Sequence, residues 1–260
     1  MTVLVTGGAR RIGRAIVNAL AAGGWRVLVH SRLPGDPDAE SLAREVGGVA
    51  LSADLSDPLG PASLFNAAVE AAPDISALVN NAALFSAAGE LPPEELAEME
   101  SVNVEAPRKL TTMLAMRLGT NEEGCHALSA ERLPVRGAVV NLLDSRVLAC
   151  EPRTPYARTK ADMMASQMKL AGLMSPYVRV NFVAPGPVLP PTRGGRVRGG
   201  EMLLDSRPTP EDVASAVAYL LSARSVTGAV LPVDSGQSLL DALEQGRFPA
   251  EPSQNKRGGK

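Results

Sequence analysis

The sequence has few of the residues that support several common kinds of protein chemistry. Its 260 residues include two cysteines, two histidines and only 3% aromatic residues. Cys125 and Cys150 are too few for a disulfide framework or a zinc cluster, so we expect free thiols in a reducing cytoplasm. With His30 and His126 as the two histidines, we predict no metal site.

The sequence also lacks an excess of charge of one sign and long apolar runs. The 26 basic and 28 acidic residues give a formal net charge of −2, whereas a dedicated nucleic-acid binder usually shows a basic excess. No apolar run approaches the roughly 18 residues of a membrane span. Met1 leads directly into a short apolar run without the basic start of a signal peptide. We therefore expect a cytoplasmic protein that binds neither nucleic acid nor membrane.

Short apolar segments alternate with longer segments rich in alanine and leucine. The predicted strands are Thr2–Thr6, Arg26–His30, Val49–Leu51, Ala77–Asn80, Ala138–Leu143, Val178–Val183 and Val230–Val233. The predicted helices are Arg11–Ala22, Pro37–Val46, Ala62–Ala71, Pro93–Leu118, Pro155–Met174 and Pro210–Ser222. This alternation predicts an α/β fold, a single doubly wound domain with a parallel sheet and helices on both faces. An eight-stranded barrel is the competing architecture.

The pattern sets the limits of the domain and is interrupted twice. We predict one domain over residues 1–247 and a disordered tail over 248–260, which is polar and rich in glycine and proline. Gly119–Gly137 is polar, which predicts an exposed excursion between a helix and a strand. Pro185–Gly200 is rich in proline and glycine, and a loop of that length predicts a lid or a binding loop.

The first strand is followed by a glycine-rich turn that opens the first helix, Thr6-Gly7-Gly8-Ala9-Arg10-Arg11-Ile12-Gly13. Glycines let the backbone turn sharply and approach a phosphate, and the helix N-terminus supplies N–H donors. A tight turn without a ligand is the alternative. Because the turn joins the first strand to a helix, we favour a dinucleotide site. The predicted cofactor contacts in this turn are Gly7, Arg10, Arg11, Ile12 and Gly13.

The end of the second strand indicates which dinucleotide binds. An acidic residue there would bind the ribose hydroxyls of NAD. The sequence reads His30-Ser31-Arg32, with no acidic residue before Asp36. Arg32 offers a guanidinium to a 2′-phosphate, so these three residues predict NADP(H); a solvated loop arginine is the alternative.

Tyr156 and Lys160 lie four residues apart at the start of a predicted helix, so they share one of its faces. A surface pair is one interpretation. The other is catalytic: the ammonium lowers the pKa of the phenol toward neutrality, and the tyrosine donates a proton.

Five motifs in this order resemble the short-chain dehydrogenase/reductase family across about residues 1–240. They are Thr6–Gly13, Asn80-Asn81-Ala82, Asn103, Tyr156-x-x-x-Lys160 and Pro185-Gly186. The resemblance implies a Rossmann domain of seven parallel strands, a nicotinamide cofactor and a homotetramer or homodimer. It also implies that Asn103 holds a water in a proton relay with Lys160 and Tyr156. The further cofactor contacts that it implies are Asp54, Leu55, Asn81, Ala82, Pro185, Gly186 and Val188.

Three departures from the usual family pattern resemble the pteridine reductases, including the dihydromonapterin-reductase-like members. Arg11 replaces a glycine of the phosphate loop, Asp144 stands where the catalytic serine is usual, and Phe85 follows the second asparagine of its motif. The resemblance implies that Phe85 stacks on a pterin, that Arg11 contacts phosphate and pterin, and that Asp144 and Tyr156 serve the ring nitrogens. Each residue also has a structural alternative: first-turn solvation for Arg11, core packing for Phe85, and an ion pair of Asp144 with Arg146 or Arg153.

Three functions follow. The first is NADPH-dependent reduction of a pterin C=N bond, because an ionised carboxylate suits an edge of N–H groups. The second is reduction of a carbonyl group, in a 3-oxoacyl thioester, a sugar or another ketone, with Ser145 or a water replacing the missing serine. The third is a cofactor-binding sensor without catalysis, against which the intact Tyr156, Lys160 and Asn103 argue.

Overall fold

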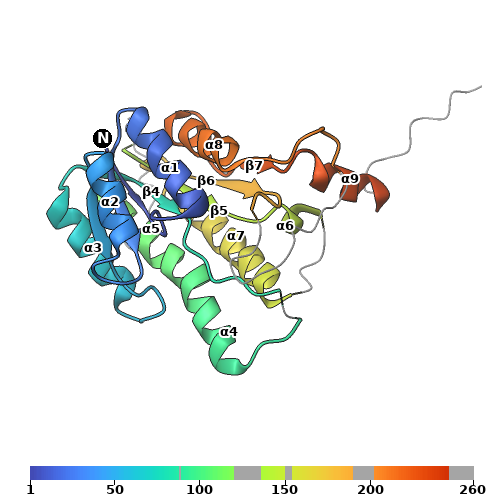
Figure 1. Cartoon of the computed structure of the whole chain (residues 1–260), viewed down its shortest axis with the longest axis horizontal. Helices are drawn as coiled ribbons and strands as arrows, with labels where there is room; N and C mark the ends of the chain where they lie inside the picture. The colour runs from blue at the N-terminus through green and yellow to red at the C-terminus, as the bar shows by residue number, and fades with distance from the viewer. Residues whose placement is uncertain (88, 120–135, 150–153, 190–201, 246–260) are drawn as a thin grey trace, which may run out of the picture.

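The computed structural model describes residues 1–87, 89–119, 136–149, 154–189 and 202–245. Within these ranges, seven parallel strands form one sheet in the order β3-β2-β1-β4-β5-β6-β7 (Figure 1). The strands are β1 (Thr2–Val5), β2 (Arg26–Ser31), β3 (Val49–Ser52), β4 (Ile75–Asn80), β5 (Gly137–Leu142), β6 (Val178–Pro185) and β7 (Val230–Val233). The strand order reverses between β1 and β4, which places a crevice at their carboxyl ends. The predicted doubly wound α/β sheet is confirmed.

Helices cover both faces of this sheet. They are α1 (Arg11–Ala22), α2 (Pro37–Glu45), α3 (Gly60–Ala71), α4 (Pro93–Glu100), the π-helical segment η1 (Ser101–Glu105), α5 (Ala106–Arg117), α6 (Arg146–Ala149), α7 (Pro155–Leu173), α8 (Pro210–Ser222) and α9 (Gln237–Glu244). Prolines occupy the first helical turn of several of these helices, where the missing N–H has no intrahelical partner.

The two faces of the sheet bury alternate residues of the strands. Val3 and Val5 lie in a core with the apolar faces of α1, α2 and α8. Leu4, between them, lies in a second core with α3, α5 and α7. This alternation is the period-two geometry of a strand, and burial on both faces explains why the strands are apolar runs.

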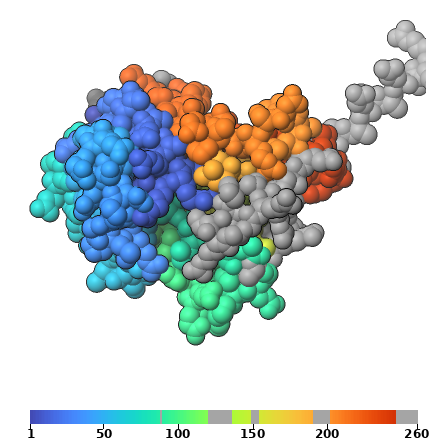
Figure 2. Space-filling model, in the orientation of Figure 1, coloured from blue at the N-terminus to red at the C-terminus, as the bar shows by residue number. Residues whose placement is uncertain are grey.

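The first and eighth helices lie side by side on one face, although most of the chain separates them (Figure 1). In the space-filling view, the blue N-terminal segment and the orange segment near the C-terminus form one continuous surface (Figure 2). This packing fixes α1 against the sheet. The glycine-rich turn that precedes α1 is thereby held at the carboxyl end of β1.

The predicted helix Pro93–Leu118 is three elements, because a five-residue π-helical segment separates α4 from α5. Asn103 lies in this segment and is fully buried. Single π-helical turns are rare and occur often at functional sites. The short helices α6 and α9 were not predicted; α9 begins after Gly236, whose φ of 80° is left-handed.

Several predictions fall on residues outside the described ranges. They concern the tail over 248–260, most of Gly119–Gly137, the loop Pro185–Gly200 from residue 190 onward, and the residues Cys125, His126 and Cys150. Among the described residues, no helix has the length and apolarity to cross a membrane. The same residues contain no group of three or more histidine, cysteine, aspartate or glutamate side chains arranged for a metal ion.

Candidate active site

The glycine-rich turn has the backbone of a phosphate-binding loop. Gly7 has a φ of 61°, and a Cβ added to Gly13 would overlap the Gly7 carbonyl oxygen. Both positions therefore require glycine. Arg11 also has a positive φ, 55°, which is unusual for a residue with a side chain. Backbone strain of this kind clusters at ligand sites.

The N-terminus of α1 is suited to an anion. Its N-cap residue, Arg10, makes no side-chain capping hydrogen bond, and the first turn contains no acidic residue. In contrast, the Asp36 side chain caps α2 by accepting from the Asp38 amide. No carboxylate from the N-cap or the first turn therefore lies at the positive end of α1, and a helix N-terminus of this kind binds phosphate. The turn fits the pyrophosphate of a dinucleotide.

His30 lies behind the turn. It is 2% exposed, and its Nδ1 accepts from the Gly7 amide at 3.1 Å while its Nε2 lies 3.0 Å from the Ala53 carbonyl oxygen. The two contacts require the neutral tautomer with the proton on Nε2. Burial lowers the pKa of His30, which favours this neutral form. The histidine thus joins the turn to the end of β3.

The two arginines predicted near the adenosine phosphate are both paired with carboxylates. Arg10 makes two hydrogen bonds to Asp36, at 2.8 and 3.0 Å, and also contacts Asp38. Arg32 donates to Asp54 at 2.9 Å and contacts Glu98 at 3.2 Å. All four pairs include a side chain that is at least half exposed. A phosphate can therefore compete for these arginines at little cost in stability.

The other predicted cofactor residues of this half occupy the neighbouring strand ends. The Asn81 side-chain amide donates to the carbonyl oxygens of Thr6 and Gly7, both at 2.9 Å. The Ala82 amide donates to the Thr6 hydroxyl at 3.0 Å. These bonds tie the exit of β4 to the turn. Leu55 is buried at 6% exposure, and the Ser31 hydroxyl donates to the Leu33 carbonyl oxygen.

On the other side of the crevice, Pro185 ends β6 and is followed by a tightly packed glycine. The Gly186 amide donates to the Val233 carbonyl oxygen at 2.9 Å, and a Cβ on Gly186 would lie 2.9 Å from that of Asp234. Val188 is partly buried against the core beneath. A side chain at position 186 would therefore push the chain away from β7.

Tyr156 and Lys160 are buried on one face of α7, as their spacing predicted, with exposures of 8% and 2%. The Lys160 Nζ donates to the Leu142 carbonyl oxygen at 2.7 Å and lies 5.8 Å from the centre of the Tyr156 ring. Burial lowers the pKa of Lys160 to about 8, although Asp144 opposes this effect. The ammonium is thus held beside the ring by a backbone carbonyl.

The prediction that Lys160 lowers the pKa of the Tyr156 phenol toward neutrality is wrong for this structure. Burial raises the pKa of Tyr156, the negative charge of Asp144 raises it further, and the positive charge of Arg146 lowers it. The reason is that the charged phenolate is penalised when water is removed from it. The phenol of Tyr156 therefore keeps its proton in this environment.

Asp144 lies in a fork formed by Arg146. Its Oδ1 accepts from the Arg146 amide at 3.0 Å and from Nε at 2.8 Å, and its Oδ2 accepts from Nη2 at 2.7 Å. The Arg146 guanidinium carbon lies 5.8 Å from the centre of the Tyr156 ring. The ion-pair alternative for Asp144 is thus present, next to Tyr156. Ser145 is buried, and its amide donates to the Pro185 carbonyl oxygen at 2.9 Å.

Phe85 is not a core residue, because it is 53% exposed. Its ring meets that of Tyr156 edge to face, with centres 4.8 Å apart and planes at 75°. The Asn103 side chain holds Leu84, the residue before Phe85. It accepts from the Leu84 amide at 2.8 Å and donates to the Leu84 carbonyl oxygen at 2.9 Å. The same Nδ2 donates to the Thr159 hydroxyl at 3.0 Å. Asn103 therefore links the Phe85 segment to α7.

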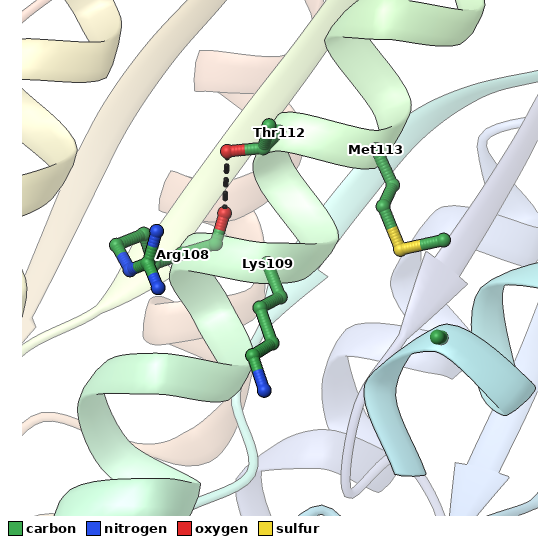
Figure 3. A pocket seen from close by; sticks show the side chains of 5 residues that line it. Arg108, Lys109, Thr112 and Met113 are labelled. Atoms are coloured by element: carbon green, nitrogen blue, oxygen red, sulfur yellow. Dashed lines mark hydrogen bonds between the residues drawn. The ribbon is translucent and has the colours of Figure 1, made fainter. Parts of the chain in front are cut away.

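Sequence reasoning named Arg146 only as an ion-pair alternative and Thr6 only as part of the glycine-rich motif, and it missed Thr159. A cation two residues after Asp144 is the one signal in the sequence that points to Arg146. A separate surface pocket lies between α3 and α5, lined by Ala62, Arg108, Lys109, Thr112 and Met113 (Figure 3). None of its lining residues belongs to the site described above.

Comparison with known proteins identifies the family. Residues 7–238 match the family model described as enoyl-(acyl carrier protein) reductase. The chain is 31% identical to L-rhamnose 1-dehydrogenase (NAD(P)(+)) of Azotobacter vinelandii, over 90% of this chain and 95% of that protein. The chain belongs to the short-chain dehydrogenase/reductase family. It is therefore an NAD(P)-dependent oxidoreductase, as its site residues indicate.

Two solved structures of this family are similar over nearly the whole chain. FolM alternative dihydrofolate reductase 1 from Brucella suis, crystallised in complex with NADP, has a TM-score of 0.76 and 32% identity and covers 92% of this chain and 95% of its own. The protein of the same name from Brucella canis, also complexed with NADP, has a TM-score of 0.75 and 29% identity, with 98% of each chain covered.

Proposed function

We propose that this reductase transfers hydride from NADPH to a C=N bond of a pterin, of the dihydropterin or dihydrofolate type. The observation that carries the proposal is Asp144, a carboxylate beside Tyr156 at the position where carbonyl reductases of this family have a serine. A carboxylate accepts hydrogen bonds from the N–H groups of a pterin edge. It would repel the negative charge that develops on a carbonyl oxygen. The names of the two FolM structures support the same substrate class.

The site residues divide the work of such a reaction. NADPH, when bound, supplies the hydride. Tyr156 donates the proton to the ring nitrogen, and its raised pKa keeps it protonated until then. Lys160, fixed on the Leu142 carbonyl oxygen, places a positive charge beside the ring of Tyr156 and stabilises the phenolate that forms. Asn103 holds Phe85 in place and, as the family resemblance implies, holds a water of the relay.

Two further residues would bind the pterin ring. Phe85 presents a half-exposed ring beside Tyr156, which is an apolar surface for an aromatic substrate to stack on. Arg11 is exposed at the start of α1, where it can reach both a cofactor phosphate and the carbonyl edge of the substrate. Asp144 orients the ring by accepting from its N–H groups.

We propose NADP(H) rather than NAD(H) as the cofactor. The end of β2 has no acidic residue, and Arg10 and Arg32 lie where a 2′-phosphate would exchange with their exposed carboxylate partners. Arg32→Met should reduce the preference for NADPH over NADH at least tenfold, measured as the ratio of dissociation constants. Arg14→Met removes an exposed, ion-paired arginine of α1 and should leave the ratio unchanged. An equal effect of both variants would contradict the assignment.

Carbonyl reduction is the second candidate, favoured by the resemblance to L-rhamnose 1-dehydrogenase. It requires the Ser145 hydroxyl or a water to bind the carbonyl oxygen. Ser145 is buried, and its backbone is held by the Pro185 carbonyl oxygen.

The decisive experiment is stopped-flow NADPH oxidation with dihydrobiopterin, dihydromonapterin, dihydrofolate and a panel of ketones and sugars. We expect turnover of a pterin, and a loss of at least tenfold in kcat/KM for Asp144→Ser. Asp162→Ser, an exposed aspartate on α7, is the matched control and should have no effect. Carbonyl turnover that increases in Asp144→Ser would establish the second candidate. Cofactor binding without turnover of any substrate would establish a sensor.

We further propose that the chain assembles as a homodimer or homotetramer. Met116 on α5 and Leu173 at the end of α7 are 41% and 46% exposed, which leaves apolar surface for a second copy. Light scattering after size exclusion should give two or four times the mass of 27.1 kDa. A monomer at micromolar concentration would contradict this expectation.

A further inference from the structure

Arg146 binds the Asp144 carboxylate through three hydrogen bonds from one residue. A carboxylate offers about four lone-pair sites, two on each oxygen. Oδ1 accepts from the amide and from Nε of Arg146, so both of its sites are used, while among the described residues Oδ2 accepts from Nη2 alone. Asp144 therefore keeps one acceptor site, on Oδ2, for a further donor.

A contribution to folding stability does not explain this ion pair, because its side chains are too exposed. The Arg146 side chain is 49% exposed and that of Asp144 is 19% exposed. Pairs of this exposure contribute little to the free energy of folding. Their position is more informative, because the guanidinium lies near the ring of Tyr156, which is 8% exposed.

Among the described residues, three charged groups lie close to the Tyr156 ring, on the elements packed around it. Asp144 and Arg146 come from the segment after β5, and Lys160 comes from α7. The charges of Asp144 and Arg146 change the pKa of the phenol in opposite directions. Phe85, from the segment after β4, is uncharged and contacts the edge of the ring.

We propose that Arg146 is a positioning residue of the reaction: it fixes the Asp144 carboxylate with one open acceptor and offsets its negative charge at Tyr156. The inference rests on Tyr156 as the proton donor, which is part of the proposed function for either substrate class. Without Arg146, the carboxylate would oppose formation of the phenolate after proton transfer. It would also rotate freely and meet the substrate in more than one orientation.

The test is a charge cycle at the two positions, measured as the pH at which kcat is half-maximal on its alkaline limb. The ammonium of Lys160, beside the Tyr156 ring and with a pKa of about 8, loses its proton before the phenol does, so this limb reports the charges around the pair. Arg146→Met should raise this midpoint by about one pH unit, because a compensating positive charge is removed. Asp144→Asn should lower it. The double variant should return close to the wild-type midpoint, because an ion pair with no net charge is replaced by two uncharged side chains.

Two further variants separate charge from orientation and from general damage. Arg146→Lys keeps the positive charge but loses the two-pronged guanidinium contact with Asp144. It should therefore have the wild-type midpoint but a KM several-fold above that of the wild type. Arg158→Met removes an exposed arginine two residues after Tyr156 and should leave both quantities unchanged. The proposal is overturned if Arg146→Met shifts the midpoint no more than Arg158→Met, or if the double variant keeps the full shift of Arg146→Met.

The cycle uses whichever substrate the wild type reduces, so a failure of pterin reduction is seen separately from a failure of the charge cycle. The same variants are also titrated without substrate, as complexes with NADP⁺, by the ring carbon resonance of Tyr156, which reports the ionisation of the neighbouring Lys160 ammonium. The resonance is assigned with Tyr156→Phe. The same opposite-sign pattern is expected there, and its absence overturns the proposal even if no substrate is turned over.

Discussion

The left-handed backbone of Arg11 makes a prediction about the strain stored in the phosphate loop. Its φ is 55°, at a position where glycine is usual in this family. A left-handed backbone costs a residue with a side chain about 1–2 kcal/mol. Glycine avoids this cost but loses about 0.5–1 kcal/mol through its greater freedom in the unfolded chain. Removing a cation from the positive end of α1 adds about 0.3–1 kcal/mol of stabilisation.

The exposed Arg11 side chain also takes part in an interaction, whose loss costs at most about 1 kcal/mol. Arg11→Gly should therefore raise the free energy of unfolding by up to about 1 kcal/mol, which corresponds to up to about 2–4 °C in Tm for a domain of this size. The assay is urea denaturation of the cofactor-free protein. The same variant should raise KM for the substrate, because the side chain that we assign to the substrate is lost. Stability and activity are thus expected to change in opposite directions.

The matched control is Arg10→Gly. Arg10 has an ordinary extended backbone, with a φ of −138°, and pairs with Asp36. Its replacement relieves no strain. The freedom of glycine costs about 0.5–1 kcal/mol, the lost exposed ion pairs cost up to about 1 kcal/mol, and removing a cation from the positive end of α1 returns about 0.3–1 kcal/mol, so the free energy of unfolding should fall by up to about 1 kcal/mol. If Arg11→Gly were destabilising by as much as Arg10→Gly, strain at Arg11 would be refuted as the reason for the stability change.

Three more predictions concern buried groups of the site. The pKa of Lys160 is about 8 in the folded protein and 10.5 ordinarily, so the unfolded chain binds the extra proton between these values. Lys160→Met should therefore be more stable than wild type by up to about 3 kcal/mol below pH 8, and this advantage should disappear by about pH 10.5. Paired denaturation curves of the two proteins measure the difference in the free energy of unfolding at each pH. A difference that does not depend on pH would contradict the burial of the Lys160 charge. The lowered pKa of His30 means that its contribution to stability is present above pH 6.5 and is lost as the pH falls below it. His30→Gln can accept from Gly7 and donate to Ala53, so it should keep the two contacts and weaken this acid sensitivity. His30→Leu should lower the free energy of unfolding by about 1–3 kcal/mol and weaken NADPH binding. Equal behaviour of the two variants would exclude the hydrogen-bonding role of His30. Gly13→Ala should lower the free energy of unfolding by about 3 kcal/mol or more and abolish NADPH binding in calorimetry, because the alanine Cβ overlaps the Gly7 carbonyl oxygen. Normal binding by this variant would show that the turn can open.

The sequence by itself determined the fold class and the helix face that Tyr156 and Lys160 share. Buried parallel strands are apolar on both faces, so their runs are visible in the chain, and Arg11–Ala22 was predicted with its true bounds. Local spacing also determined that Tyr156 and Lys160 share a helix face. Such features depend on neighbours in the sequence, where backbone geometry is short-range and regular.

Only the tertiary structure decided how the site residues act on one another. The effect of Asp144 and Arg146 on Tyr156, and the burial that raises the pKa of the phenol, depend on contacts between segments that follow different strands. The same holds for His30, which we predict to contact the cofactor and which holds Gly7 and Ala53 together in the structure. Burial and charge act through space, with a strength set by distance and by the exclusion of water, and the order of residues in a chain specifies neither before it folds.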